Sequence, residues 1–290
     1  RIVNKGFCGM TNDIYAARAA LHMWEEPCIS GEHGSGAVFF SGCTLRCIFC
    51  QNSEIAAAQV GKKITVERLS DIFLELQDKC ANNINLVTAT HFVPQVAEAL
   101  VKAKNKGLVI PVVYNSSAYE NVSTLNMLDG LVDVYLPDMK YIDSRLSAEY
   151  SKAPDYADVA KAAIHEMVRQ TGKPEFFIVD DELVKSGRVE AGIMKQGVIV
   201  RHLVLPGTTK DSKAVIKYLI DTYGDDIYIS IMSQYTPFER LKKHPLLSRK
   251  VTRKEYNSVV DYAIDCGINN GFIQEGDVAE ESFIPEFDYE

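Results

Sequence analysis

The sequence lacks any long hydrophobic run. No apolar stretch approaches the roughly 18 residues that a helix needs to cross a bilayer, and no charged-then-apolar leader precedes a cleavage site. We therefore expect a soluble, cytoplasmic protein with no membrane partner. The chain opens at Arg1 rather than at a methionine, so we also expect residues upstream of it.

An excess of positive charge is missing as well. Lys and Arg number 31 against 39 Asp and Glu, which leaves a formal net charge of −8. A general nucleic-acid-binding protein needs a basic face that displaces the counterions around phosphates. The charge balance therefore argues against nucleic acid as a partner.

No linker rich in proline, glycine or serine divides the chain, and it contains no internal repeat or low-complexity segment. Hydrophobic residues make up 47% and charged residues 24%, which is typical of a globular protein with a buried core. We expect one main domain over residues 31–274. It follows an N-terminal extension over residues 1–30, truncated upstream, and precedes an acidic C-terminal tail over residues 275–290.

Cysteine is sparse and unevenly spaced. An odd total of seven does not suit a disulfide framework in a chain of 290 residues. Four cysteines stand alone, and since free cysteine is commonly buried, we expect packing roles for Cys8, Cys28, Cys80 and Cys266. The remaining three, Cys43, Cys47 and Cys50, stand together.

Short β-rich apolar runs alternate with longer segments of helical period. The expected strands are residues 37–40, 84–88, 109–114, 132–136, 198–205 and 227–231, and the expected helices lie near residues 66–80, 94–106, 155–171, 211–223 and 252–266. Thr65 suits the start of the first helix and Gly267 the end of the last. Near-continuous apolar strands favour a parallel sheet covered on both faces. The pattern predicts an α/β barrel, or an open part of one, with its chemistry at the C-terminal ends of the strands.

The cysteine loop, residues 41–52, directly follows the first expected strand. Its three thiols, separated by three and then two residues, can converge on one metal centre. A cubane of four irons normally takes four thiolates, so three leave one iron free for an exogenous ligand and indicate a reactive site. The alternatives need a fourth protein ligand. These are a non-catalytic iron–sulfur electron carrier, and a zinc-stabilised interaction protein using His33 or His91.

The spacing CxxxCxxC, with an aromatic residue before the last cysteine, resembles the hallmark of radical S-adenosylmethionine (SAM) enzymes. Residues 42–52 are similar to the glycyl-radical-enzyme activases, the group that includes pyruvate formate-lyase activating enzyme, and especially to an uncharacterised activase-like branch. The resemblance extends from about residue 30 to about residue 240. It implies a partial (β/α)6 barrel and two cofactors, a [4Fe-4S] cluster held by Cys43, Cys47 and Cys50, and SAM. No other cysteine-rich insertion follows the loop, which implies a single cluster.

The resemblance also implies the reaction. One electron from the reduced cluster cleaves SAM to methionine and a 5′-deoxyadenosyl radical, which abstracts a hydrogen atom from the substrate. We expect an oxidoreductase that activates a glycyl radical enzyme or modifies another protein or peptide. A radical SAM reaction on a small molecule or another macromolecule is the alternative.

An electron donor of the flavodoxin or ferredoxin type is the second expected partner. Residues 240–254 contain seven Lys or Arg residues in a protein that is acidic overall. We hypothesise that this basic segment docks an acidic donor, because complementary charge raises association rates. A solvated surface without a partner is the alternative.

The resemblance assigns SAM contacts to the cysteine loop and the second strand end. Phe49 is expected near the adenine, with an ordinary core position as the alternative. Thr90 and His91 stand where the activases carry a Gly-Gly-Glu-Pro stretch whose backbone approaches the SAM amine. Either His91 makes its own contact with SAM or this loop lies farther away.

The third and fourth strand ends supply three further candidates. Asn115 is expected to face the pocket, as in the Thr-Asn-Gly of the activases. Asp138 and Lys140 resemble their Asp-x-Lys, and period-two alternation places both on one face. In the functional interpretation Lys140 neutralises the SAM carboxylate and Asp138 orients the ribose or the lysine. Pairing of Asp138 with Lys140 is the structural alternative.

The fifth and sixth strand ends complete the set. Arg201 interrupts an apolar strand and needs an anion, either a SAM carboxylate or Asp138. His202 points to the opposite face, where we expect a structural role. Gln234 occupies the place from which the family contacts adenine.

Overall fold

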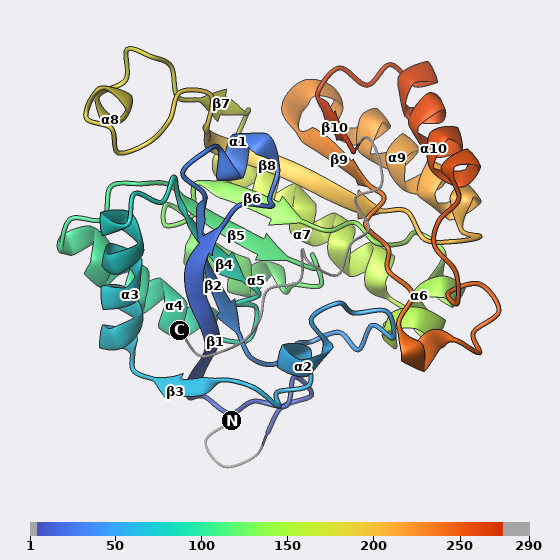
Figure 1. The fold of residues 1–290 in the computed structure, drawn as a ribbon, viewed down its shortest axis with the longest axis horizontal. Helices are drawn as coiled ribbons and strands as arrows, with labels where there is room; N and C mark the ends of the chain where they lie inside the picture. The colour runs from blue at the N-terminus through green and yellow to red at the C-terminus, as the bar shows by residue number, and fades with distance from the viewer. Residues whose placement is uncertain (1–4, 275–290) are drawn as a thin grey trace.

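The computed structural model describes residues 5–274, whose strands form an open, largely parallel sheet (Figure 1). The strand order is β10-β9-β8-β6-β5-β4-β2-β1-β3, with β7 added to β8. The parallel strands are β2 (Ser35–Phe40), β4 (Ile84–Val87), β5 (Val112–Ser116), β6 (Val134–Pro137), β8 (Met194–Leu203), β9 (Tyr228–Met232) and β10 (Gly271–Ile273). The antiparallel strands are β1 (Ile14–His22), β3 (Lys62–Ile64) and β7 (Glu175–Phe176). Because β10 and β3 stand at opposite ends of this order, the sheet is not closed, and the predicted partial (β/α)6 barrel is confirmed.

Five longer helices cover the sheet: α3 (Val66–Asp78), α4 (Val93–Asn105), α7 (Tyr156–Thr171), α9 (Thr209–Tyr223) and α10 (Arg253–Asp265). The Thr65 side chain accepts a hydrogen bond from the Arg68 backbone, so its predicted role at the start of α3 is confirmed. Short helices complete the connections: α1 (Pro27–Ser30), α2 (Ser53–Ala56), α5 (Val122–Leu125), α6 (Ser144–Ser151), α8 (Glu182–Lys185), and the 3-10 turns Asn126–Leu128, Gly224–Asp226 and Glu239–Leu241.

All six expected strands are present, with ends that differ from the expected ones by at most four residues. The strand expected at 109–114 begins only at Val112. The preceding residues form a loop in which Gln77 Oε1 accepts from the backbone of Val109 at 2.8 Å. Pro111 also lacks the amide hydrogen that a ladder position requires. The sequence analysis did not predict β1, β3, β7 or β10.

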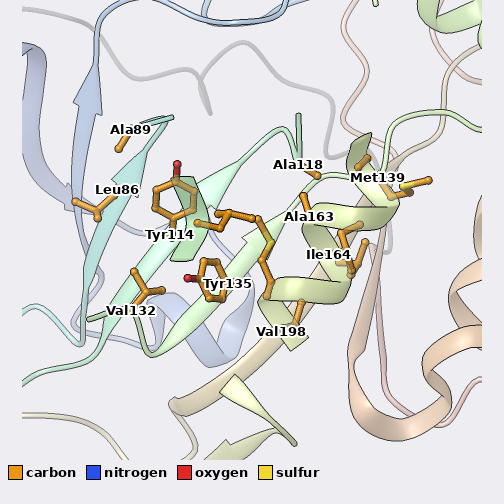
Figure 2. Packing of buried hydrophobic residues seen from close by; sticks show 14 of the residues in the cluster. Leu86, Ala89, Tyr114, Ala118, Val132, Tyr135, Met139, Ala163, Ile164 and Val198 are labelled. Carbon is orange, nitrogen blue, oxygen red and sulfur yellow. The ribbon is translucent and has the colours of Figure 1, made fainter. Parts of the chain in front are cut away.

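Alternation along the strands separates the helix-facing core from the barrel interior. Leu86, Tyr114, Tyr135 and Val198 are register partners across β4, β5, β6 and β8, and all four are buried (Figure 2). Figure 2 shows them on the side of the sheet where Ala163 and Ile164 of α7 pack. Since successive side chains point to opposite faces, the neighbouring residues of each strand face the interior.

Helix α1 packs into the barrel interior at the N-terminal ends of the parallel strands. Cys28 and Ile29 of α1 are buried against Val113, Val134 and Ile199, which belong to the inward-facing rows. Residues 14–22 of the predicted N-terminal extension form β1, which pairs with β2. Residues of the predicted extension therefore contribute a strand to the sheet and a helix, α1, to the barrel interior.

Three remaining expectations concern single features. Cys8 and Cys28 are buried, but Cys80 is exposed, so the packing role predicted for it is wrong; it stands at the end of α3 with a φ of +63°. No helix among residues 5–274 is both long enough and apolar enough to span a bilayer. The predicted acidic tail at 275–290 lies outside the described residues.

Candidate active site

The cysteine loop forms one wall of a cavity at the C-terminal ends of the strands. The cavity has a volume of about 280 Å³, and Cys43, Cys47 and Cys50 all line it. The three thiols are half-buried. The strand ends contribute polar and charged side chains to the same cavity, namely Asn115, Asp138, Lys140, Arg201 and Gln234.

A close backbone approach fixes the start of the loop. Gly42 has a φ of +89°, in the region that favours glycine, and a Cβ at this position would lie 2.7 Å from the carbonyl oxygen of Cys8. Its amide donates to the carbonyl of Ile55 at 2.7 Å. The loop therefore turns tightly between residues 8–10 and α2, and a larger residue at position 42 would displace it.

The end of α6 holds the middle of the loop. The Ile48 amide donates to the carbonyl of Tyr150 at 2.8 Å, and Cys47 Sγ lies 3.0 Å from Ser151 Oγ. Phe49 is buried among Tyr141, Tyr150 and Tyr235, with ring centroids 6.4–6.5 Å apart. Phe49 thus occupies the aromatic core that was the structural alternative and also lines the cavity. Its contact with adenine stays a prediction.

The environment of the thiols opposes their ionisation in the absence of a cation. Burial raises the pKa of Cys43 to about 12 and that of Cys50 to about 11, and the charge of Cys47 adds to both shifts. The charge of Lys140 acts in the opposite direction on both groups. A bound metal centre would overcome the remaining cost, because thiolates are the metal-binding form of cysteine.

Asp138 connects the two cations of the cavity. Its Oδ2 lies 2.6 Å from Lys140 Nζ, and its Oδ1 accepts from Arg201 Nε at 3.0 Å. Burial by itself would raise the pKa of Asp138, but the charges of Lys140 and Arg201 outweigh it and lower the pKa. Asp138 therefore forms ion pairs with both Lys140 and Arg201. These pairs are the structural alternatives that the sequence left open.

Glu25, which the sequence analysis did not identify, is a further member of this network. Its Oε2 accepts from Arg201 Nη1 at 3.0 Å, and its Oε1 accepts from Asn85 at 3.0 Å and from Asn115 at 3.2 Å. The side chain is only 9% exposed. Trp24 beside it also lines the cavity. The one sequence signal for a buried polar group at this place was Asn85, which interrupts the apolar strand expected at 84–88.

Arg201 also contacts Asn115, a partner that was not predicted from the sequence. Its Nη2 donates to Asn115 Oδ1 at 2.6 Å. Burial would lower the pKa of Arg201, but the charges of Asp138 and Glu25 raise it, so the guanidinium stays charged. His202 is buried on the other face and donates from Nδ1 to the carbonyl of Met139 at 2.8 Å, as expected for a structural histidine.

Thr90 and His91 do not line the cavity that contains the cysteines. They line a second cavity together with Glu120, and Thr90 Oγ1 donates to Glu120 Oε1 at 2.6 Å. His91 Nε2 lies 2.7 Å from the carbonyl oxygen of Ser41, at the start of the cysteine loop. Their role as SAM contacts stays a prediction, and the position of His91 links it to the backbone of the loop.

The fold and the site define an open parallel barrel with a three-cysteine loop at its mouth. Residues 37–180 match the family model described as the Radical SAM superfamily, so this part of the chain is a radical SAM domain. The family implies SAM and an iron–sulfur cluster as cofactors.

The chain is also similar to known proteins in sequence and in fold. The chain is 27% identical over 270 residues to an uncharacterized protein of Methanocaldococcus jannaschii, a match that covers 91% of this chain and 70% of the relative. Among solved structures it is similar in fold to Streptococcus suis SuiB bound to S-adenosylmethionine, with a TM-score of 0.52 and 13% identity over 81% of this chain. A structure of SuiB with its precursor peptide SuiA gives a TM-score of 0.50, also at 13% identity and 81% coverage. The chain spans about half the length of these solved structures, covering 49% and 46% of them.

The donor set fits an iron–sulfur cubane better than a single ion. Among residues 5–274, no three His, Cys, Asp or Glu side chains are close enough together to hold one metal ion. A zinc site needs four ligands around a single centre. A cubane instead distributes its thiolates over different irons, and the three cysteines that share the cavity wall are of the type it requires.

Proposed function

We propose that this protein is a radical SAM enzyme in which Cys43, Cys47 and Cys50 hold a [4Fe-4S] cluster. The observation that carries the proposal is that these cysteines share one cavity with the charged strand-end residues. When bound, the cluster and SAM together supply one-electron cleavage of the sulfonium to a 5′-deoxyadenosyl radical.

The side chains of the cavity would bind and orient SAM. Lys140 would neutralise its carboxylate, and Asp138, 2.6 Å from Lys140 Nζ, would orient that lysine. Asn115 and Arg201 would supply further polar contacts from the neighbouring strands. Because Lys140, Asp138 and Arg201 are each less than one-fifth exposed, little water competes for them.

Phe49 and Gln234 would contact the adenine. Both line the cavity, and the backbone carbonyl of Gln234 accepts from Gln51 Nε2 of the cysteine loop at 2.9 Å. Thr90 and His91 would act on the amine of SAM through the loop backbone, since His91 holds the carbonyl of Ser41.

The test is anaerobic reconstitution with iron and sulfide, followed by reduction in the presence of SAM. We expect 5′-deoxyadenosine to form, and Cys47→Ala to abolish it. Cys80→Ala is the matched control, because Cys80 is exposed and does not line the cavity. A reduced cluster that forms no 5′-deoxyadenosine from SAM would contradict the proposal.

For the substrate, we infer a protein or peptide, in the sharpest form a glycyl radical enzyme. The similarity of residues 42–52 to the activases supports this, and the fold neighbour SuiB is bound to a precursor peptide. The reduced enzyme, SAM and a panel of glycyl radical enzymes should give a glycine-centred radical signal in electron paramagnetic resonance (EPR) spectra. If 5′-deoxyadenosine forms but none of these enzymes gives a glycine-centred radical signal, the activase assignment is wrong. The proposed cleavage of SAM would not be affected by that result.

For the electron donor, we infer an acidic protein of the flavodoxin or ferredoxin type. The basic segment 240–254 follows β9 and begins with an arginine that contacts the cysteine loop. Part of its charge is balanced within the chain, because Lys242 pairs with Glu239 and Arg249 with Glu255.

A further inference from the structure

Arg240 contacts the cysteine loop from the solvent side. Its Nε donates to the carbonyl of Ile48 at 3.1 Å and its Nη2 to the carbonyl of Cys50 at 2.5 Å. Its Nη1 lies 3.4 Å from Ser53 Oγ, at the start of α2. One exposed side chain therefore bridges the two residues that flank Phe49 and the helix that follows the loop.

The guanidinium is held in place although it is exposed. It lies over the Phe238 ring, 4.5 Å from the ring centroid, which restricts its rotation. The hydrogen bond from Gln51 Nε2 to the carbonyl of Gln234 joins the same two segments a second time. Hydrogen bonds of Arg240 and Gln51 therefore join the segment after β9 to the cysteine loop.

We propose that Arg240 is a positioning residue for the iron–sulfur cluster. It fixes the backbone on both sides of Phe49 and places a permanent positive charge at the backbone carbonyl of Cys50. This inference deepens the proposed function and rests on a cluster bound by the three cysteines.

Two physical effects follow from this placement. A planar fork can donate to two carbonyls at once, which a lysine cannot do in the same geometry, so Arg240 should resist opening of the loop. Reduction adds one negative charge to the cluster, and a nearby cation favours that state.

Two substitutions separate these effects in the reconstituted full chain without SAM. Arg240→Gln removes both the charge and the fork, whereas Arg240→Lys keeps the charge. Lys243→Gln is the control, because Lys243 is an exposed cation of the same segment. The measurements are the midpoint potential of the cluster, from a redox titration followed by EPR, and the rate of iron loss to a chelator.

We expect Arg240→Gln to disfavour reduction by about threefold to tenfold, where tenfold corresponds to about 59 mV for one electron. Arg240→Lys should stay close to the wild-type potential. Both variants should lose iron about threefold to tenfold faster, since hydrogen bonds to two loop carbonyls are removed or weakened. Lys243→Gln should change neither quantity.

An unchanged potential and an unchanged rate of iron loss in Arg240→Gln would overturn the inference. Should that variant not fold, a wild-type rate of iron loss in Arg240→Lys would overturn it instead. Failure of the wild-type chain to assemble a cluster would overturn the proposed function, and the inference with it.

Discussion

Asp138 determines how charge is distributed among the residues of the cavity. Both of its oxygens are engaged, one by Lys140 and one by Arg201. A carboxylate between two cations stays ionised even when buried. The Lys140 ammonium must therefore share its charge between Asp138 and any further anion that enters the cavity.

Glu25 is the second carboxylate that pairs with Arg201, beside Asp138. Removing the charge of Glu25 should therefore lower the stability of the fold. We expect Glu25→Gln to lower the free energy of unfolding by about 1–3 kcal/mol, because it leaves a buried cation with one fewer partner while Asp138 remains. Denaturant unfolding of the chain without cofactors measures this.

Glu98→Gln is the control for Glu25. Glu98 also pairs with a cation, Lys102, but its side chain is 59% exposed, so we expect a change of about 0.5 kcal/mol or less. Equal effects at the two positions would show that the Glu25–Arg201 pair adds no special stability.

His202 should make stability depend on pH. Burial lowers its pKa to about 4, from an ordinary value of 6.5. Between these values the unfolded chain binds a proton that the folded chain does not, so the contribution of His202 is present above pH 6.5 and is lost as the pH falls towards 4. We expect the difference in unfolding free energy between the wild type and His202→Gln to shrink by about 2–3 kcal/mol between pH 7 and pH 4.5.

Glu120 acts with the opposite sign but does not disturb this comparison. Burial raises its pKa to about 7, so its contribution is present below pH 4.5 and is lost as the pH rises through 7. It is present in both proteins and cancels in the difference. A difference that does not vary with pH would show that His202 is not a buried neutral group.

Among the elements, β4 and its neighbours carry the row of buried side chains that supports the site (Figure 2). Leu86 on β4 is fully buried and is the register partner of Tyr114. We expect Leu86→Ala to destabilise the fold by about 2–5 kcal/mol through lost burial and the cavity left behind.

Val101→Ala on α4 is the control for Leu86, because Val101 is 46% exposed. Its cost should stay near or below about 0.5 kcal/mol. Chemical denaturation of both variants gives the comparison. A small effect at Leu86 would mean that the core repacks around the missing side chain.

Elements with a strong local pattern could be predicted from the sequence. The apolar runs of β2, β4, β5, β6, β8 and β9 and the amphipathic period of α3 indicated their own positions, and the spacing of the cysteines indicated the loop. The chain at 14–22 mixes alanines with Arg18 and shows no clear alternation, so β1 was not predicted. Glu25 could not be found either, since its partner Arg201 is 176 residues away in the sequence.

On the scale of the whole molecule, the proposed docking of an acidic electron donor on the basic segment, residues 240–254, can be tested by charge reversal. We expect Lys242→Glu combined with Lys243→Glu to slow reduction of the cluster by an acidic flavodoxin by about tenfold at low salt. The effect should fade at high salt, where exposed charges are screened. Anaerobic stopped-flow kinetics measures the rate.

The same charge change on α4, Lys104→Glu with Lys106→Glu, controls for net charge alone. Equal rates for the two double variants would place donor docking elsewhere on the protein.

The ion pair between Glu25 and Arg201 also has a consequence for biosynthesis. During translation the guanidinium partner is made 176 residues after the carboxylate. Closing so long a loop is slow compared with forming local helices. The nascent polypeptide must therefore complete β8 before this buried ion pair can form.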